Sequence, residues 1–453
     1  MPQHPSSALS LASGINEGTL PSDFGVRASQ AAIALRNGEL NAIVDFDPRD
    51  ADEQLERLAA RLSAGEHLPL AGVPVAVKDH IRVKGWRFTE GSPLFRDRVA
   101  DDDDLVISRM KRAGAIVVGR TNMSEFGCKG NTTNLLYGPT RHPLDPRLTP
   151  GGSSGGAASA VAGGLVPLAL AGDGGGSIRR PAAHVGAVGF KPSAGMVAEP
   201  LDSSPTAVLG PIAMNVADCR ALFEAVAGPD STDPLSIPPP ERPGAAHPAR
   251  IAWSARLGLD VPVDETVARA LAEAIGQLKE AGLPIEAADP AWPPDASEEA
   301  LMPLQHAALA AQFGAVWQRR PDLFDPDIGD QIRSGLALSG ADVARAQGLS
   351  LSIARSAARF FASGFDFLLS PTTPCPAWPL EDLGPRMIGG RTVGPRGHAV
   401  FTPFVNHAFC PAISQPVPAP GLPVGLQIVA PRFRDRAVLD LAARVEAVLA
   451  QTS

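Results

Sequence analysis

The sequence has few of the residues that metal sites, disulfide frameworks and nucleic-acid surfaces require. Its 453 residues include four cysteines, none in a CxxC pair, and nine histidines without HxxxH or HExxH spacing. We therefore expect neither a zinc site nor a disulfide framework, and we predict no metal or other cofactor. The net charge is −8 and no Lys/Arg-rich stripe stands out, so nucleic acid is not an expected partner.

Long apolar runs are also missing. No stretch approaches 18 uninterrupted apolar residues, and residues 1–14 lack the charged start and apolar segment of a signal peptide. We therefore expect neither a membrane span nor export. Four cysteines in a chain of this length fit a reducing compartment, so the expected location is the cytoplasm.

What the chain does contain is the composition of a folded α/β protein. Hydrophobic residues make up 44% and charged residues 19%, which is enough for a sizeable core. Strand-like runs lie at 72–78, 115–119, 165–171, 250–254, 367–370 and 424–429. Helical patterns lie between and beyond them, at 52–64, 104–113, 157–162, 263–281, 297–319, 341–363 and 438–449. This alternation predicts an α/β fold with a central, largely parallel sheet.

Two Gly/Ser segments are the first candidates for chemistry, TPGGSSGG at 149–156 and DGGGSIR at 173–179. Runs of glycine let backbone N–H groups approach a ligand and point the same way. A serine that ends such a run can attack a carbonyl whose developing oxyanion those N–H groups bind. Flexible linkers are the alternative interpretation, which is disfavoured because each segment lies between apolar elements.

Other interpretations of these segments are weaker. A phosphate-binding loop would need GxxxxGK[ST], which is absent. Residues 151–155 match GxSxG, the nucleophile elbow of α/β-hydrolases, with Asp366 and His407 as the best partners downstream. Neither partner lies in a recognisable context. Lys78 ends the apolar run VPVAVK; it is either an edge lysine that reaches solvent or, if buried, a base with a lowered pKa.

These segments, with others in the same order, resemble the amidase signature family. The matching stretches are GVPVAVKD (72–79), GAIVVGRTNMSEFG (114–127), PGGSSGGAASAVAGG (150–164), GDGGGSIRRPA (172–182), VGFKPS (188–193), DFLLSPTTP (366–374) and GLPVGLQIVAP (421–431). They span nearly the whole chain. The ordered set, with Lys78, Ser153 and Ser177 separated by 75 and 24 residues, makes the resemblance highly specific.

The resemblance implies a Ser–cis-Ser–Lys triad. Ser177 would be the nucleophile, and Ser153, joined to Gly152 by a cis peptide bond, would be the bridging residue. Lys78 would be the base that draws a proton through Ser153. No histidine is placed to activate Ser177, so a lysine is the logical substitute.

The resemblance also implies an oxyanion hole made by the backbone N–H groups of Gly174, Gly175, Gly176 and Ser177. The family fold is one α/β/α domain around a mixed, strongly twisted sheet. Gly174 stands where Thr or Ile is often found in the family, and this departure removes a side chain beside the hole.

Three residues are assigned to the substrate pocket. Gly127 and Cys128 lie at the end of the SEFG motif, near where family members line the pocket, and Cys128 is interpreted as a packed thiol. Arg180 is less fixed in the family than its neighbour and is the candidate to meet a substrate carboxylate. Arg179 is interpreted as a buried ion-pair residue of the scaffold, and His407 as structural.

The domain organisation follows from the same comparison, since no repeat or sharp change in composition divides the chain. We predict a single amidase domain over 1–453. Its parts are a helical lead-in (1–70), a catalytic core (71–230), a variable helical region on the substrate side (231–365) and the C-terminal part of the core (366–453). Aromatic residues in 295–345 and 376–402, such as Phe313, favour an apolar or aromatic substrate group.

The predicted function is that of a serine amidohydrolase. It would cleave the C–N bond of a small-molecule amide, or of a carbamate as a urethanase does, through an acyl-enzyme on Ser177. One alternative is the glutaminase subunit of a tRNA-dependent amidotransferase, which is usually tyrosine-rich in its second half, whereas this chain has one tyrosine, Tyr137. The other is a non-catalytic binding protein on the same fold, which would lack a triad residue. The sequence is also compatible with a homodimer.

Overall fold

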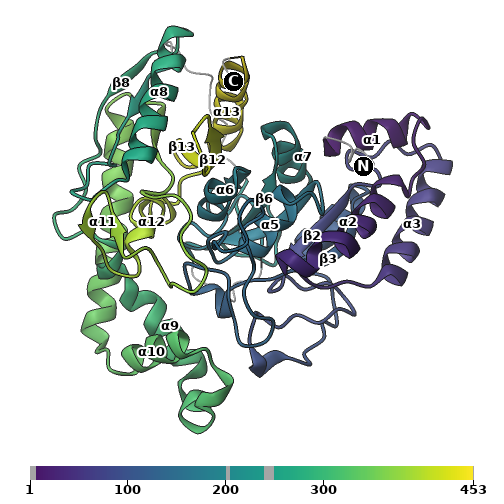
Figure 1. Cartoon of the computed structure of the whole chain (residues 1–453), viewed down its shortest axis with the longest axis horizontal. Coiled ribbons are helices and arrows are strands. Elements are labelled where there is room, and N and C mark those ends of the chain that lie inside the picture. Colours follow the sequence, from purple (N-terminus) through teal and green to yellow (C-terminus); the bar gives the residue numbers. More distant parts are fainter. Residues whose placement is uncertain (1–6, 200–204, 239–248, 452–453) are drawn as a thin grey trace.

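One large sheet organises the molecule (Figure 1). The computed structural model describes residues 7–199, 205–238 and 249–451. Within these ranges the sheet has eleven strands: β1 (Ile43–Asp45), β2 (Pro74–Lys78), β3 (Ile116–Thr121), β4 (Leu168–Asp173), β5 (Val188–Lys191), β6 (Val208–Ala213), β7 (Ile251–Trp253), β8 (Ile285–Ala287), β9 (Phe367–Pro371), β12 (Ala412–Val417) and β13 (Val424–Val429). A separate two-stranded sheet pairs β10 (Met387–Ile388) with β11 (Arg391–Thr392).

The sheet is mixed, which confirms the fold that the resemblance implied, whereas the largely parallel sheet expected from the alternation of helices and strands is wrong. The strand order is β1-β3-β2-β4-β6-β5-β12-β13-β9-β7-β8. Parallel pairs occur at β3-β2-β4 and at β9-β7-β8. From β4 through β6, β5, β12 and β13 to β9 every neighbour is antiparallel. β12 and β13 are joined by six residues, too few for a crossover between parallel strands, so this connection forces an antiparallel pair.

The helices are α1 (Ala8–Asn16), α2 (Phe24–Leu40), α3 (Pro48–Ser63), α4 (Leu105–Arg112), α5 (Gly155–Ala162), α6 (Arg179–Val185), α7 (Val216–Val226), α8 (Glu265–Glu280), α9 (Glu298–Arg319), α10 (Pro326–Leu336), α11 (Gly340–Ala362), α12 (Thr402–His407) and α13 (Asp435–Ala450). Two groups of helices pack on this sheet, one that contains α5 and α6 and one that contains α4, α7, α13 and α8. The small-residue helix α5 packs on β2 and β4 and against α6. The second group, α4, α7, α13 and α8, packs in succession, with α7 on β6 and α13 on β12.

Local sequence signals account for most helix ends. The side chain of Asp264 accepts a hydrogen bond from the Thr266 N–H and caps α8. α3 begins at Pro48, four residues before the predicted start, because proline suits the first turn and Asp47 caps it.

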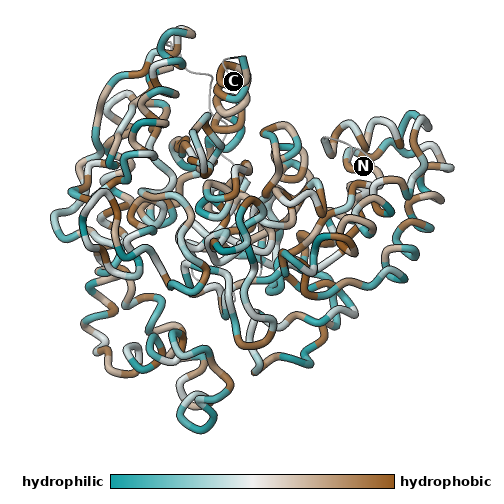
Figure 2. The backbone as a smooth tube through the Cα atoms, viewed as in Figure 1, coloured by the Kyte–Doolittle hydropathy of each residue, from teal (hydrophilic) through white to brown (hydrophobic). Residues whose placement is uncertain are grey.

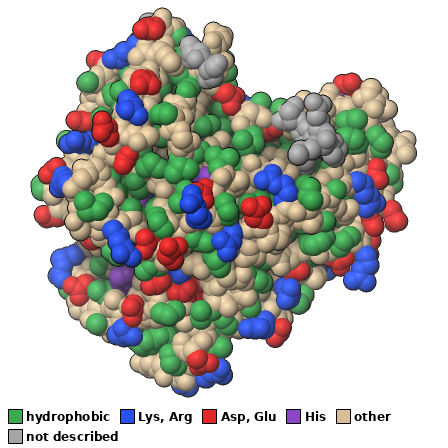
Figure 3. Space-filling view, viewed as in Figure 1, with side chains coloured by type: hydrophobic (Ala, Val, Ile, Leu, Met, Phe, Trp, Pro, Cys, Tyr) green, Lys and Arg blue, Asp and Glu red, His purple; other side chains and the backbone are tan. Residues whose placement is uncertain are grey.

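α9 and α10 form a helical pair that lies apart from the sheet (Figure 1). The sequence did not predict α10, whose short amphipathic pattern is interrupted by Gly329 and Gly335. Hydrophilic and hydrophobic residues alternate along these outer helices (Figure 2). Acidic and basic side chains are interspersed over the face shown in Figure 3. Across the described ranges, no helix is both long and apolar enough to span a membrane.

Candidate active site

Lys78 and Ser153 are in direct hydrogen-bond contact at the candidate site. Lys78 ends β2, a strand whose five residues are all buried, and its Nζ lies 2.7 Å from Ser153 Oγ. Only 3% of Lys78 and 1% of Ser153 is exposed. Burial lowers the pKa of Lys78 to about 7, against the opposing effect of Asp173. A large fraction of Lys78 is therefore neutral at neutral pH, as a general base must be.

The loop that carries Ser153 is held by the segment that contains Thr132. The Gly152–Ser153 peptide bond is cis. Thr132 Oγ1 donates to the Gly151 carbonyl at 2.9 Å, and the Ser124 N–H donates to the Ser153 carbonyl at 3.2 Å. A Cβ on Gly152 would stand 2.7 Å from the Asn131 carbonyl oxygen, so the glycine allows this close approach.

Ser177 lies in a turn that Asp173 organises. Asp173 ends β4, and its carboxylate accepts hydrogen bonds from the N–H groups of Gly176 at 2.6 Å and Ile178 at 3.2 Å. Gly176 has a φ of +114°, a conformation open to glycine and strained for other residues. Ser177 is 6% exposed. The turn thus presents Ser177 at the end of the strand next to β2.

One of the four N–H groups expected in an oxyanion hole is already hydrogen-bonded within the protein. The Gly176 N–H is already bound by Asp173 and is not available to a substrate oxygen. The N–H groups of Gly174, Gly175 and Ser177 have no hydrogen-bond partner within the described ranges. These three remain candidates for binding a developing oxyanion.

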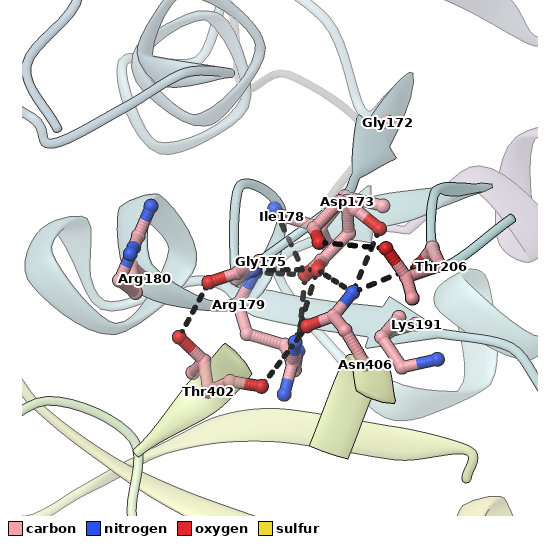
Figure 4. A network of polar contacts seen from close by, with 12 residues as sticks. Gly172, Asp173, Gly175, Ile178, Arg179, Arg180, Lys191, Thr206, Thr402 and Asn406 are labelled. Atoms are coloured by element: carbon pink, nitrogen blue, oxygen red, sulfur yellow. Dashed lines mark hydrogen bonds and ion pairs between the residues drawn. The ribbon is translucent and has the colours of Figure 1, made fainter. Parts of the chain in front are cut away.

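A buried ion pair between Arg179 and Asp173 stabilises this turn (Figure 4). Arg179 Nη2 lies 2.9 Å from Asp173 Oδ1, and both side chains are fully buried, which confirms Arg179 as a scaffold ion-pair residue. Arg179 keeps the pKa of Asp173 well below its usual range despite burial. Asn406 Nδ2 donates to the Asp173 carbonyl at 3.0 Å, and Thr402 Oγ1 donates to the Gly175 carbonyl at 2.8 Å. Sequence reasoning missed Asn406 and Thr402, which lie more than 220 residues away in the chain.

Lys78 and the Ser177 turn lie at the ends of two parallel neighbours, β2 and β4, and the two serine loops contact each other through hydrogen bonds. The carboxyl ends of parallel strands meet at one edge of the sheet, which brings Lys78 and the Ser177 turn together. Ser154 Oγ donates to the Gly172 carbonyl at 3.1 Å, and Arg180 Nη2 lies 3.4 Å from the Gly152 carbonyl oxygen. All three residues of the predicted triad therefore lie in adjoining segments.

The nucleophile-elbow alternative is not assembled. His407 Nδ1 lies 2.7 Å from Ser350 Oγ, and Asp366 accepts a hydrogen bond from the Arg250 N–H at 2.9 Å. Ser153 contacts Lys78 instead. The prediction that His407 is structural agrees with its buried contact to Ser350.

The residues assigned to the pocket lie around Ser153. A Cβ on Gly127 would stand 3.4 Å from Ser153 Oγ. Burial raises the pKa of Cys128 to about 12, so this residue is a neutral thiol. The ring of Phe126 stacks on Phe313 with centroids 4.1 Å apart, which places an aromatic cluster beside Gly127. Arg180 is almost fully buried.

Metal ligands are not gathered at this site. The part of the chain that the structure describes contains no group of three or more His, Cys, Asp or Glu side chains arranged to hold a metal ion.

Comparisons with known proteins show the family to which this chain belongs. The family model described as Amidase matches residues 25–439. An acylamidase of Rhodococcus erythropolis is 34% identical, over 98% of this chain and 95% of that protein. One subunit of the glutamyl-tRNA(Gln) amidotransferase of Thermus thermophilus is 33% identical, over 94% and 95% respectively. The structure of a bacterial aryl acylamidase of the amidase signature family matches with a TM-score of 0.90 at 27% identity, over 99% of this chain and 97% of that one. The chain therefore belongs to the amidase signature family and is an amidase, a hydrolase of the C–N bond in amides.

Proposed function

We propose that this amidase works through Ser177 as nucleophile, with Lys78 as the base and Ser153 as the proton relay between them. The observation that carries the proposal is the 2.7 Å contact between a buried lysine, with a pKa of about 7, and Ser153 Oγ. A serine hydroxyl is a poor nucleophile until a neighbouring base takes its proton. Neutral Lys78 can accept the Ser153 proton while Ser153 accepts the proton of Ser177.

The reaction then runs in two halves. Ser177 Oγ attacks the amide carbonyl, its proton passes to Ser153, and the Ser153 proton passes to Lys78. The oxyanion is bound by the N–H groups of Gly174, Gly175 and Ser177. The proton returns through Ser153 to the leaving nitrogen, the C–N bond breaks, and an acyl-enzyme remains. Water, deprotonated along the same path, attacks the acyl-enzyme and releases a carboxylic acid.

The substrate is a small-molecule amide, and the same steps extend to carbamates, whose carbonyl is attacked in the same way. Gly127, Cys128 and Arg180 line the proposed pocket, and the cluster around Phe126 and Phe313 supplies an apolar wall. Apolar walls with a few polar groups are typical of small-molecule sites. A cytoplasmic location is part of the same proposal.

Covalent labelling tests the proposal. A fluorophosphonate reagent, which reacts with activated serines, will modify Ser177, and peptide mass spectrometry will locate the adduct. Ser177→Ala will remove it. An adduct on Ser153 that survives this substitution would contradict the assignment and favour the nucleophile-elbow mechanism.

A glutaminase subunit is the second candidate, because a chain of a glutamyl-tRNA(Gln) amidotransferase is nearly as similar to this protein as the acylamidase. Such a subunit works with partner chains. Hydrolysis of anilides by the purified chain alone, without release of ammonia from glutamine, supports the amidase proposal; the reverse pattern supports the glutaminase. The non-catalytic alternative is disfavoured by the intact Lys78–Ser153 contact.

A further inference from the structure

A short segment beside Ser153 has a strained backbone. Phe126 and Gly127 both have left-handed φ values, +50° and +73°. This conformation is open to glycine, whereas a phenylalanine is strained in it. Such strain persists only where the surrounding structure enforces it, and it concentrates at active sites. Residues 125–129, which we call the Phe126 segment, therefore need contacts that hold them in place.

The Phe126 segment lies directly against the Ser153 loop. The N–H of Ser124, the residue before the segment, donates to the Ser153 carbonyl at 3.2 Å. A Cβ on Gly127 would stand 3.4 Å from Ser153 Oγ, the atom that contacts Lys78. A shift of the segment would therefore change the surroundings of the Ser153 hydroxyl.

Asp325, which immediately precedes α10, binds both ends of the Phe126 segment. Its backbone N–H donates to Glu125 Oε2 at 2.7 Å, and its Oδ2 accepts a hydrogen bond from Lys129 Nζ at 2.6 Å. The other oxygen of Glu125 accepts from Ser92 Oγ at 2.6 Å. Glu125, Lys129 and Asp325 are all buried. Because an unpaired buried charge is unfavourable, the Lys129–Asp325 ion pair resists separation.

The helical pair α9–α10 supplies further contacts to the same segment. Gln331 Nε2 on α10 donates to the Cys128 carbonyl at 3.1 Å, and Gln305 Nε2 on α9 donates to Gln331 Oε1 at 2.6 Å. The Phe126 ring stacks on Phe313 of α9 with centroids 4.1 Å apart. These helices lie apart from the sheet (Figure 1), yet they hold the strained segment next to the Ser153 loop.

Asp325 also caps α10, since its Oδ1 accepts a hydrogen bond from the Asp327 N–H at 3.2 Å. A cap needs only a neutral acceptor. The negative charge of Asp325 instead serves Lys129, which Asp327 reaches less closely at 3.4 Å. We infer that Asp325 is a positioning residue, which together with Lys129 fixes the Phe126 segment against the Ser153 loop and keeps Ser153 placed for proton transfer. The inference rests on the proposed function, in which Ser153 is the relay.

Asp325→Asn tests the inference, because asparagine still caps a helix and keeps the backbone N–H but cannot neutralise Lys129. The substrate is the acyl p-nitroanilide that the wild type hydrolyses fastest. For folded enzyme, kcat will fall about 10- to 100-fold, the loss expected of a small misplacement near the reacting groups, and KM will stay within about threefold. The matched control is Asp330→Asn, which breaks an exposed ion pair with Arg333 on the same helix and will leave kcat unchanged.

Lys129→Met and the double variant Lys129→Met/Asp325→Asn complete a double-mutant cycle. Each single variant leaves one member of the buried pair charged without its partner, whereas the double variant leaves neither charged. The double variant will therefore have a kcat at least about threefold above that of the less active single variant, and the two losses will not add. Should Asp325→Asn fail to fold, Lys129→Met and the double variant decide.

Three results would overturn the inference. A wild-type kcat in folded Asp325→Asn would make Asp325 only a brace for α10. A raised KM with an unchanged kcat would make the Phe126 segment only a binding wall. Additive losses in the cycle would show that Lys129 and Asp325 do not act as a pair.

Failure of this inference is distinguishable from failure of the proposed function. The release of p-nitroaniline does not depend on which serine attacks, whereas fluorophosphonate labelling identifies that serine. An adduct on Ser177 together with a wild-type kcat in Asp325→Asn would reject the inference alone. An adduct on Ser153 together with a reduced kcat in Asp325→Asn would reject the proposed roles of the two serines, and the Phe126 segment would still position the Ser153 loop.

Discussion

Lys78 Nζ and Ser153 Oγ lie 2.7 Å apart in the buried edge of the sheet, where two parallel strands end side by side. The lysine comes from a strand of apolar residues, and the serine comes from a glycine-rich loop held by Thr132. Burial that would normally be unfavourable for a lysine gives this one a pKa of about 7. The buried position of Lys78 at the end of β2 therefore explains why its side chain could act as a base near neutral pH.

Ser177→Ala will reduce turnover of p-nitroanilides below detection, because no other group replaces the attacking oxygen. Release of p-nitroaniline measures the effect. Circular dichroism will show a folded protein, since no side-chain hydrogen bond depends on the Ser177 hydroxyl in the described structure. Turnover at near wild-type rates in this variant would contradict the assignment.

Asp173→Asn will destabilise the fold and impair catalysis together. It breaks a fully buried ion pair with Arg179, which typically costs about 3–5 kcal/mol. Urea unfolding measures the loss. The matched control is Asp440→Asn, which breaks an exposed pair with Arg220 and will cost at most about 1 kcal/mol.

The pH dependence of this effect has a defined sign. The pKa of Asp173 is lowered in the folded state, mainly by Arg179 acting against burial. Its stabilising contribution is therefore complete above the unfolded pKa of about 4 and is lost as the pH falls toward the folded pKa. The difference in the free energy of unfolding between the wild type and Asp173→Asn will therefore become smaller below about pH 4. A difference in unfolding free energy that does not change with pH would show that the loss of the ion pair does not cause the destabilisation.

Chelators will leave activity intact. The proposed triad would supply both the nucleophile and the base, and the described residues offer no cluster of metal ligands. The measurement is anilide hydrolysis after dialysis against EDTA, with elemental analysis of the dialysed protein. Activity that is lost on dialysis and restored by zinc would contradict the proposed mechanism.

Much of the proposed site could be read from the sequence because the residues proposed for its chemistry lie in contiguous motifs. Lys78, Ser153 and Ser177 each stand at a fixed place in such a motif, and the structure brings all three motifs to one sheet edge. The family and its amide-hydrolysing activity, predicted from the same motifs, are confirmed by the comparisons.

What the sequence could not show depends on contacts between distant segments. Asn406 reaches Asp173 from α12, and His398 meets Trp378 from outside the motifs. The Gly176 N–H belongs to a glycine run that favours an oxyanion hole, yet the side chain of Asp173 takes it. The alternation of helices and strands favoured a largely parallel sheet for a related reason, since strand direction depends on pairing partners that local periodicity does not reveal; the mixed sheet followed only from the family resemblance.

One neighbouring group has a pKa that could be confused with that of Lys78. Burial raises the pKa of Glu125 to about 7, against the hydrogen bonds from Ser92 and from the Asp325 N–H. Glu125→Gln removes this titration and retains hydrogen-bonding capacity at the same position. Burial keeps the pKa of His80 well below its usual value, so the titration of His80 is not confused with a titration near pH 7.

The central claim is that neutral Lys78 accepts a proton through Ser153, and a pH–rate profile of single-turnover acylation tests it most directly. The acylation rate of the wild type and of Glu125→Gln will rise with pH through an apparent pKa near 7 and then level off, as Lys78 loses its proton. Lys78→Ala will lose at least about 10²–10⁴ in rate. Lys78→Arg will not acylate at any pH, because a guanidinium cannot be deprotonated. Near-native acylation by Lys78→Arg would contradict the proton path through Ser153.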